Sequence, residues 1–255
     1  IDGIGREDLF YGYDADDEPT LPEDRAEMLP FLDIALDAGK TVLVTDYCGT
    51  PSFVADSYSK NAARGYISFA ADSRELDRIP SGLPYSVNTS DITSLSQVRN
   101  FLYLINPMNY ASKSAYLAAL AATRYDLLLI DLYMEDEILT PADITSLRNK
   151  SGGGTRLLIA YMSIGEAEDY RYYWNEEWGN VKPSWFASEN PEWEGNYVVY
   201  YWDSNWQSII YGNDNSYLKK IIDAGFDGVY LDIIDAFTYF ENMAEYRYID
   251  EIQSH

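Results

Sequence analysis

Residues 223–232 read Asp-Ala-Gly-Phe-Asp-Gly-Val-Tyr-Leu-Asp, and this stretch decides the fold class. A helical pattern over residues 216–224 stops at Gly225, because glycine readily takes the conformation that ends a helix. The apolar residues 229–231 then predict a short buried strand that finishes at Asp232. A helix followed by a continuous apolar strand is the unit of a parallel sheet covered on both faces, so the stretch predicts an α/β protein.

The same alternation of apolar strand and helical segment extends along the chain. We expect strands at residues 3–10, 41–46, 66–72, 101–106, 126–131, 157–163, 197–203 and 229–232. The intervening segments carry helical patterns, as residues 115–123 do. About eight such units predict a TIM-type (β/α)8 barrel that forms a single catalytic domain over residues 1–255. A dinucleotide-binding sheet is disfavoured, because Gly3-Ile4-Gly5 lacks the third glycine of that fingerprint.

Charge and residue content exclude several classes of function. The 42 Asp and Glu residues outnumber the 18 Lys and Arg residues, and the formal charge of −24 disfavours nucleic acid as a partner. Cys48 is the one cysteine and His255 the one histidine, which excludes a disulfide, Ser-His-Asp or Cys-His catalysis, and metal sites built on several histidines. We expect no cofactor, no metal ligands and no membrane span. A chain that starts at Ile1 indicates a processed or trimmed N-terminus.

Polar residues finish or closely follow most of the predicted strands. They are Asp46, Asp72, Asn106, Asp131, Glu166, Asp203 and Asp232. In a barrel the carboxyl ends of the strands converge on the face that binds substrate, so these residues predict an active site. A pair of carboxyl groups suits acid and nucleophile catalysis on a glycosidic bond. Each group could instead cap a helix, and the set could hold Mg²⁺ or Ca²⁺.

Aromatic residues favour a carbohydrate ligand. The chain has 24 Tyr and 6 Trp, and many lie in one central stretch that includes Tyr161, Trp185, Trp202 and Trp206. Aromatic faces stack on the apolar faces of sugar rings, and the polar tips of Tyr and Trp bond hydroxyl groups. About half of these side chains are expected to belong to the core instead.

Three segments carry long and specific motifs. They are Ser163-Ile-Gly-Glu-Ala-Glu-Asp-Tyr-Arg171, then Asn190-Pro-Glu-Trp193 with Tyr201-Trp-Asp203, and then Gly225-Phe-Asp-Gly-Val-Tyr-Leu-Asp232 with Ile-Ile-Asp235. Together they resemble glycoside hydrolase family 114, and the resemblance covers most of the chain. It is closer to a branch labelled cysteinyl-tRNA-synthetase-related than to the endo-α-1,4-polygalactosaminidases. No His-Ile-Gly-His or Lys-Met-Ser-Lys-Ser nucleotide-binding signature occurs here, so the synthetase label carries no function over.

The resemblance implies a role for individual residues. Asp232 matches the aspartate of the family's Asp-Gly-Val-x-Pro-Asp-Asn motif and is implied to be catalytic, and Glu7 resembles the late-barrel glutamate implied to be its partner. The expected substrate-binding residues are Asp131, Glu168, Arg171 and Asp203, which match family positions, with Tyr161, Glu166, Trp202, Asp235 and Asp46. If Arg171 lies within several ångström of Asp232, we expect it to help keep Asp232 ionised as the nucleophile, and we expect Glu7 to stay protonated as the acid. In a retaining enzyme their carboxyl groups would lie about 5–5.5 Å apart, and in an inverting one about 6.5–9.5 Å.

The chain departs from the family pattern in two ways. Residues 2–11 precede the segment like residues 227–240, whereas the family has the reverse order, which predicts a circular permutation or fragments in altered order. A strand with an Asn-containing motif, expected between those two segments, is not evident, which predicts a gap in the barrel. Tyr230 and Ile233 stand where polygalactosaminidases have an acidic residue and an asparagine, so the sugar specificity stays open.

Three functions therefore compete. The first is an endo-acting glycosidase on a polysaccharide that contains amino sugars such as α-1,4-linked galactosamine, placed outside the cell or in the envelope, where such polymers lie. An acidic cleft would attract a partly deacetylated, cationic chain. The second is a barrel that binds carbohydrate without cleaving it, and the third is a metal-dependent enzyme that uses the same carboxylates. Neither the linkage nor the oligomeric state follows from the sequence.

Overall fold

The computed structural model describes residues 1–241, which divide into two compact units. Unit 1 contains Ile1–Ala160 and Gly225–Gly228, and unit 2 contains Tyr161–Ala224 and the described residues from Val229 on. Two strands pass from one unit to the other along the chain, β8 (Leu157–Ser163) and β12 (Gly228–Asp232).

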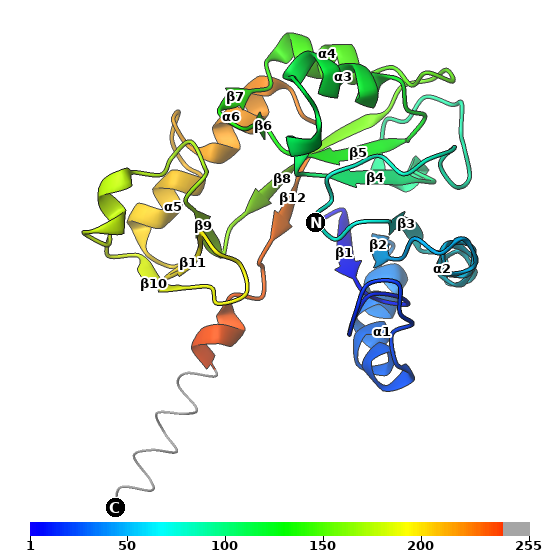
Figure 1. Ribbon diagram of the computed structural model, residues 1–255, viewed down its shortest axis with the longest axis horizontal. Coiled ribbons are helices and arrows are strands. Elements are labelled where there is room, and N and C mark those ends of the chain that lie inside the picture. Colours follow the sequence, from blue (N-terminus) through cyan, green and yellow to red (C-terminus); the bar gives the residue numbers. More distant parts are fainter. Residues whose placement is uncertain (242–255) are drawn as a thin grey trace, which may run out of the picture. The chain divides into compact units, whose positions relative to one another are not determined.

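The first part of unit 1 is a parallel three-stranded sheet in the order β1-β2-β3, with its helices beside it (Figure 1). Its elements are β1 (Gly3–Glu7), α1 (Pro22–Asp37), β2 (Thr41–Tyr47), α2 (Pro51–Ala63) and β3 (Ile67–Ala71). Both helices begin with proline, which lacks the N–H that the first turn leaves unpaired. Strand β1 ends at Glu7 because Asp8 takes a left-handed conformation, with φ +60°.

The second part of unit 1 is a run of parallel strands in which β4 pairs with β5 and β5 with β8. Its elements are β4 (Phe101–Leu104), α3 (Lys113–Ala121), β5 (Leu127–Ile130), the hairpin β6 (Tyr133–Met134) and β7 (Glu137–Ile138), α4 (Pro141–Leu147), and the short 3-10 helices η1 (Leu95–Gln97) and η2 (Pro107–Asn109). Strands β4 and β5 consist of buried apolar residues throughout, as expected of a sheet covered on both faces.

Unit 2 combines the carboxyl half of β8, which lies beside β12, with a small antiparallel sheet in the order β10-β11-β9. Its further elements are β9 (Glu166–Glu168), η3 (Glu176–Gly179), β10 (Phe186–Glu189), β11 (Asn196–Val199), α5 (Ser204–Ile210) and α6 (Tyr217–Ala224). Helix α6 is followed by Gly225 at φ +92°, the conformation expected of a glycine that ends a helix.

The α/β class with parallel strands is confirmed, and seven of the predicted strands are present, several of them shorter than predicted. The parallel strand predicted at residues 197–203 is wrong. Strand β11 ends at Val199 and pairs antiparallel, because the chain turns at Tyr201 and Trp202 and Asp203 then caps α5. The parallel strands of residues 1–241 form two open sheets, so closure into one barrel and one domain stays a prediction.

Candidate active site

Asp232 lies at the carboxyl end of β12, in unit 2, and β8 and β12 together hold its carboxyl group. Successive residues of a strand point to opposite faces, so Tyr230 and Asp232 share one face and Leu231 points to the other. The hydroxyl of Tyr161, on β8, donates a 2.7 Å hydrogen bond to Asp232 Oδ2. The backbone N–H of Ile164 donates to the Asp232 carbonyl at 3.1 Å. The strand end is therefore fixed through both its side chain and its backbone.

Burial raises the pKa of the Asp232 carboxyl above its ordinary value, since the ionised form loses hydration there. The Tyr161 hydroxyl and the Ile233 N–H both bond the carboxylate and lower the pKa, whereas the negative charges of Glu168 and Asp235 raise it. The raised pKa is opposite in direction to the lowering that a nearby cation would produce. Arg171 forms an ion pair with Glu168.

Glu166, on β9, is a second buried carboxyl group of unit 2. It accepts hydrogen bonds from Asn190 Nδ2 at 2.8 Å and from Asn196 Nδ2 at 3.5 Å. Burial raises the pKa of the Glu166 carboxyl, the two amide donors lower it, and the charges of Glu168 and Asp232 raise it. Glu166 and Asp232 thus act on one another electrostatically, and both favour the protonated form more than a solvated carboxyl does.

Glu168 and Arg171 are brought together by the structure as a buried ion pair, with side chains 3% and 7% exposed. Tyr170 donates to Glu168 Oε1 at 2.9 Å, and Arg171 Nη1 donates to the Tyr217 hydroxyl at 3.2 Å. The pair connects β9 to α6. A direct contact of either residue with substrate stays a prediction.

The turn after β12 is unusually tight, because Ile233 has φ +54°, which β-branched residues rarely adopt. Gly165 packs against this turn. A Cβ atom at position 165 would clash with the Ile233 carbonyl oxygen and would lie 2.6 Å from Ala236 Cβ. Ile233 can therefore adopt this backbone conformation because Gly165 has no side chain.

Replacing Gly165 by alanine is expected to destabilise the protein by about 1–3 kcal/mol, since overpacking against backbone forces the turn to shift. The same shift should lower the activity that depends on Asp232. Gly179→Ala is the matched control, because nothing lies within 4 Å of a Cβ there. Urea denaturation measures both variants, and equal stabilities for the two would contradict the role of Gly165.

Three further residues of unit 2 that were predicted to bind substrate are Asp203, Trp202 and Asp235. Asp203 caps α5, accepting from Asn205 N at 2.7 Å and from Ser184 Oγ at 3.0 Å, and these bonds lower the pKa of its carboxyl. Trp202 is 53% exposed and packs edge-on against Phe240. Asp235 is exposed in the turn beyond β12, and its charge acts on Asp232. Asp203 thus has a capping role that explains its position without a substrate.

In unit 1, Glu7 ends β1 and its side chain is held from the neighbouring strand. The hydroxyl of Tyr47, on β2, donates a 2.7 Å hydrogen bond to Glu7 Oε2. Tyr47 is not among the predicted site residues, although it ends an apolar strand as Asp232 ends β12.

Asp131, also in unit 1, follows β5, is 4% exposed, and accepts a hydrogen bond from Tyr133 N at 2.8 Å.

Asp46 does not lie where a substrate could reach it, which corrects its prediction as a binding residue. Its carboxyl group is fully buried. It accepts hydrogen bonds from Phe10 N, Tyr11 N, Ser57 Oγ and Asn61 Nδ2 at 2.8, 3.3, 2.6 and 3.0 Å. Asp46 therefore anchors the segment after β1 to α2, and the alternation of the strand explains why it points away from the face of Tyr47.

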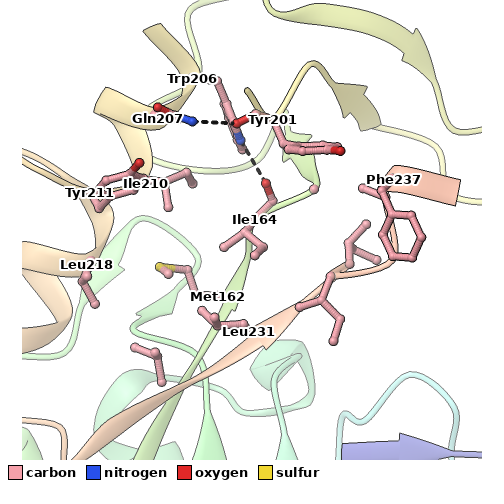
Figure 2. Close-up of a pocket in the computed structure, with 15 residues that line it drawn as sticks. Met162, Ile164, Tyr201, Trp206, Gln207, Ile210, Tyr211, Leu218, Leu231 and Phe237 are labelled. Atoms are coloured by element: carbon pink, nitrogen blue, oxygen red, sulfur yellow. Dashed lines mark hydrogen bonds between the residues drawn. The ribbon is translucent and has the colours of Figure 1, made fainter. Parts of the chain in front are cut away.

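A pocket of about 460 Å³ in unit 2 is apolar and lies on the other face of these strands. Figure 2 shows Met162 and Leu231 pointing into it from β8 and β12, with Trp206 and Ile210 of α5 across from them. Trp206 is itself buried and donates from Nε1 to the Ile164 carbonyl at 2.9 Å. Because Asp232 and Leu231 point to opposite faces, the pocket is separate from the Asp232 carboxyl.

Among residues 1–241, no group of three or more His, Cys, Asp and Glu side chains is arranged to hold a metal ion. Within the same part of the chain, no helix is long and apolar enough to cross a bilayer.

The fold defines an α/β protein with parallel strands, and carboxyl groups lie at the ends of several of these strands. The chain belongs to the glycoside-hydrolase family GH114, whose model matches residues 88–254. An uncharacterized protein of Methanocaldococcus jannaschii is 42% identical over 156 residues, which cover 60% of this chain and 42% of that protein. An uncharacterized protein of Thermotoga maritima is 51% identical over 81 residues, 32% of this chain and 24% of that protein. The chain thus spans less than half the length of these relatives.

A solved structure is also similar to part of the chain. It is the crystal structure of Aspergillus fumigatus Ega3 in complex with galactosamine, with 21% sequence identity and a TM-score of 0.35. The alignment covers 64% of this chain and 51% of that chain.

Proposed function

We propose that the protein is an endo-acting glycosidase that cleaves a polysaccharide with two carboxyl groups, Asp232 and Glu7. The observation that carries the proposal is the half-buried Asp232 carboxyl, which is held by Tyr161 at the end of β12 within the segment that matches the family. A carboxyl group with raised pKa that is fixed by a specific donor is typical of catalytic sites. Asp232 belongs to unit 2 and Glu7 to unit 1, so their pairing rests on the family resemblance.

Each residue has a defined role in a retaining mechanism. The Asp232 carboxylate attacks the anomeric carbon while the glycosidic bond breaks and Glu7 gives its proton to the leaving oxygen. Glu7 then takes a proton from water, the water oxygen bonds the anomeric carbon, and the bond to Asp232 breaks. Both carboxyl groups return to their starting states. The separation of about 5–5.5 Å that this mechanism requires stays a prediction.

The substrate we propose contains amino sugars, such as α-1,4-linked galactosamine. The formal charge of −24 supports a cationic polymer, because a negative surface raises the local concentration of positively charged chains. Polymers of this kind lie outside the cell or in its envelope, and we propose that the protein acts there.

A panel of labelled oligosaccharides, including α-1,4-galactosamine oligomers, tests the function. We expect products shorter than the substrate from the unmodified chain and none from Asp232→Asn. Binding of an oligosaccharide without cleavage by the unmodified chain would favour the carbohydrate-binding alternative. Loss of cleavage on addition of a chelator would favour the metal-dependent one.

The pH dependence of the reaction offers a further prediction. Asp232 must be ionised to attack, and its pKa is raised, so the rate should fall with decreasing pH already above the range in which a solvated aspartate protonates. Tyr161→Phe removes a hydrogen-bond donor to the ionised Asp232 carboxylate. The fall in rate at acidic pH, the acidic limb of the profile, should therefore move to higher pH. Kinetic pH profiles measure the shift. Tyr197→Phe, which removes a 3.4 Å bond to Asp169 in the same unit, is the control and should leave the limb in place.

A further inference from the structure

We propose that Tyr47 is a positioning residue for Glu7, with Arg74 holding the tyrosine ring in place, an inference that rests on the proposed function. Tyr47 lies on β2, next to β1, and is 2% exposed. Its hydroxyl donates to Glu7 Oε2 at 2.7 Å. The last side-chain torsion of a glutamate is otherwise broad, so this bond fixes the orientation of the Glu7 carboxyl group.

Arg74 covers the Tyr47 ring, with its guanidinium carbon 4.0 Å from the ring centroid. A guanidinium on an aromatic face is attracted by the negative charge of that face. Arg74 is itself fixed, since it donates to Asp8 Oδ1 at 2.8 Å, to Asp16 Oδ1 at 2.7 Å and to the Gly12 carbonyl at 2.6 Å. The ring therefore cannot swing away from Glu7 without breaking several charged contacts.

Gly12 completes this arrangement. Its φ is +114°, which favours glycine, and a Cβ there would clash with Asp8 Oδ1 and lie 3.0 Å from Tyr47 Cβ. The chain after β1 thus passes close to Tyr47. Tyr47, the last residue of β2, therefore contacts Glu7 of β1 with its hydroxyl and Arg74, which follows β3, with its ring.

The hydroxyl of Tyr47 stays a donor across the working pH range, because burial and the neighbouring Glu7 raise its pKa well above the ordinary tyrosine value. The hydrogen bond from Tyr47 to Glu7 Oε2 therefore persists across that range. Arg74, whose guanidinium lies over the Tyr47 ring, bridges Asp8 and Asp16.

Tyr47→Phe in the full chain tests the inference, because it removes one oxygen atom and keeps the ring under Arg74. The Glu7 carboxyl is followed by NMR of chains with ¹³C-labelled glutamate, and Glu7→Gln assigns its signal. We expect the pKa of Glu7 to rise by about one unit, as for loss of a hydrogen bond to a charged group. The fall of kcat at basic pH, the basic limb of the profile, should move to higher pH with the pKa of Glu7. We also expect kcat to fall about tenfold with little change in KM.

Tyr66→Phe is the matched control, since Tyr66 donates a 2.7 Å hydrogen bond to Asp33 in the same unit, at the opposite end of β3. It should leave the Glu7 signal unchanged. Arg74→Lys, which keeps the charge but loses the planar group over the ring, should raise the Glu7 pKa by a smaller amount and serves if Tyr47→Phe does not fold.

An unchanged Glu7 pKa in Tyr47→Phe overturns the inference, whatever the activity. If the pKa of Glu7 shifts in Tyr47→Phe but the unmodified chain cleaves none of the oligosaccharides, Tyr47 does position Glu7. That result would overturn the proposed function and leave the inference standing. A fall in kcat with an unmoved basic limb also overturns the inference, since a purely structural role of Tyr47 produces that result.

Discussion

Asp232→Ala is expected to lower kcat/KM for oligosaccharide cleavage by about 10⁴-fold or more, the scale on which removal of one member of a catalytic group acts. The loss should arise in the chemical step, because the alanine removes the atom that bonds the anomeric carbon. Folding should persist, since a small apolar residue removes the cost of partly desolvating the Asp232 carboxyl group. Asp214→Ala, which removes an exposed carboxylate of the same unit, should leave kcat/KM within about twofold.

Rescue chemistry distinguishes the roles of the two carboxyl groups. Azide should restore turnover to Asp232→Ala by bonding the anomeric carbon in place of the missing carboxylate. Glu7→Ala should lose about 10²–10⁴-fold on natural linkages and much less on a substrate whose leaving group needs no proton. If azide restores neither variant and the activated substrate does not spare Glu7→Ala, the assignment of nucleophile and acid is wrong.

Glu168→Ala should have the largest effect on stability, about 3–5 kcal/mol, because it breaks a buried ion pair by removing the carboxylate that Arg171 contacts. The free energy of unfolding from urea denaturation measures the loss.

An exposed ion pair of the same unit provides the control for Glu168. Lys219 and Asp223 lie 2.5 Å apart on α6 with side chains 39% and 60% exposed. Asp223→Ala should cost less than about 1 kcal/mol, as exposed pairs do. Similar losses for Glu168→Ala and Asp223→Ala would show that burial of the Glu168 pair contributes little.

Many of the aromatic residues that suggested a sugar ligand have structural roles. Trp185 and Trp206 are buried and pack with one another at 5.1 Å between ring centroids. Trp193 and Trp202 are exposed, so they remain the candidates for stacking on a sugar ring. Composition alone could not separate the two groups, because a Trp side chain is apolar enough for a core and polar enough for a surface.

The sequence by itself determined the α/β class, the position of most strands and the place of Asp232 at a strand end. These features depend on local patterns, such as an apolar run after a helix-ending glycine, which the residues reveal within a few positions. The resemblance to the family, confirmed over residues 88–254, rests on equally local motifs.

The tertiary structure alone decided which side chains meet. Glu7 and Tyr47 are 40 residues apart in sequence, and Tyr161 and Asp232 are 71 apart. Local periodicity contains no information on such contacts, because they depend on which strands pair and in what register. The same reason explains why Asp46 proved to be a buried anchor, and why Arg171 forms a buried ion pair with Glu168. A carboxylate at a strand end looks the same in the sequence whether its neighbours are protein donors or an open face, and only packing distinguishes the two.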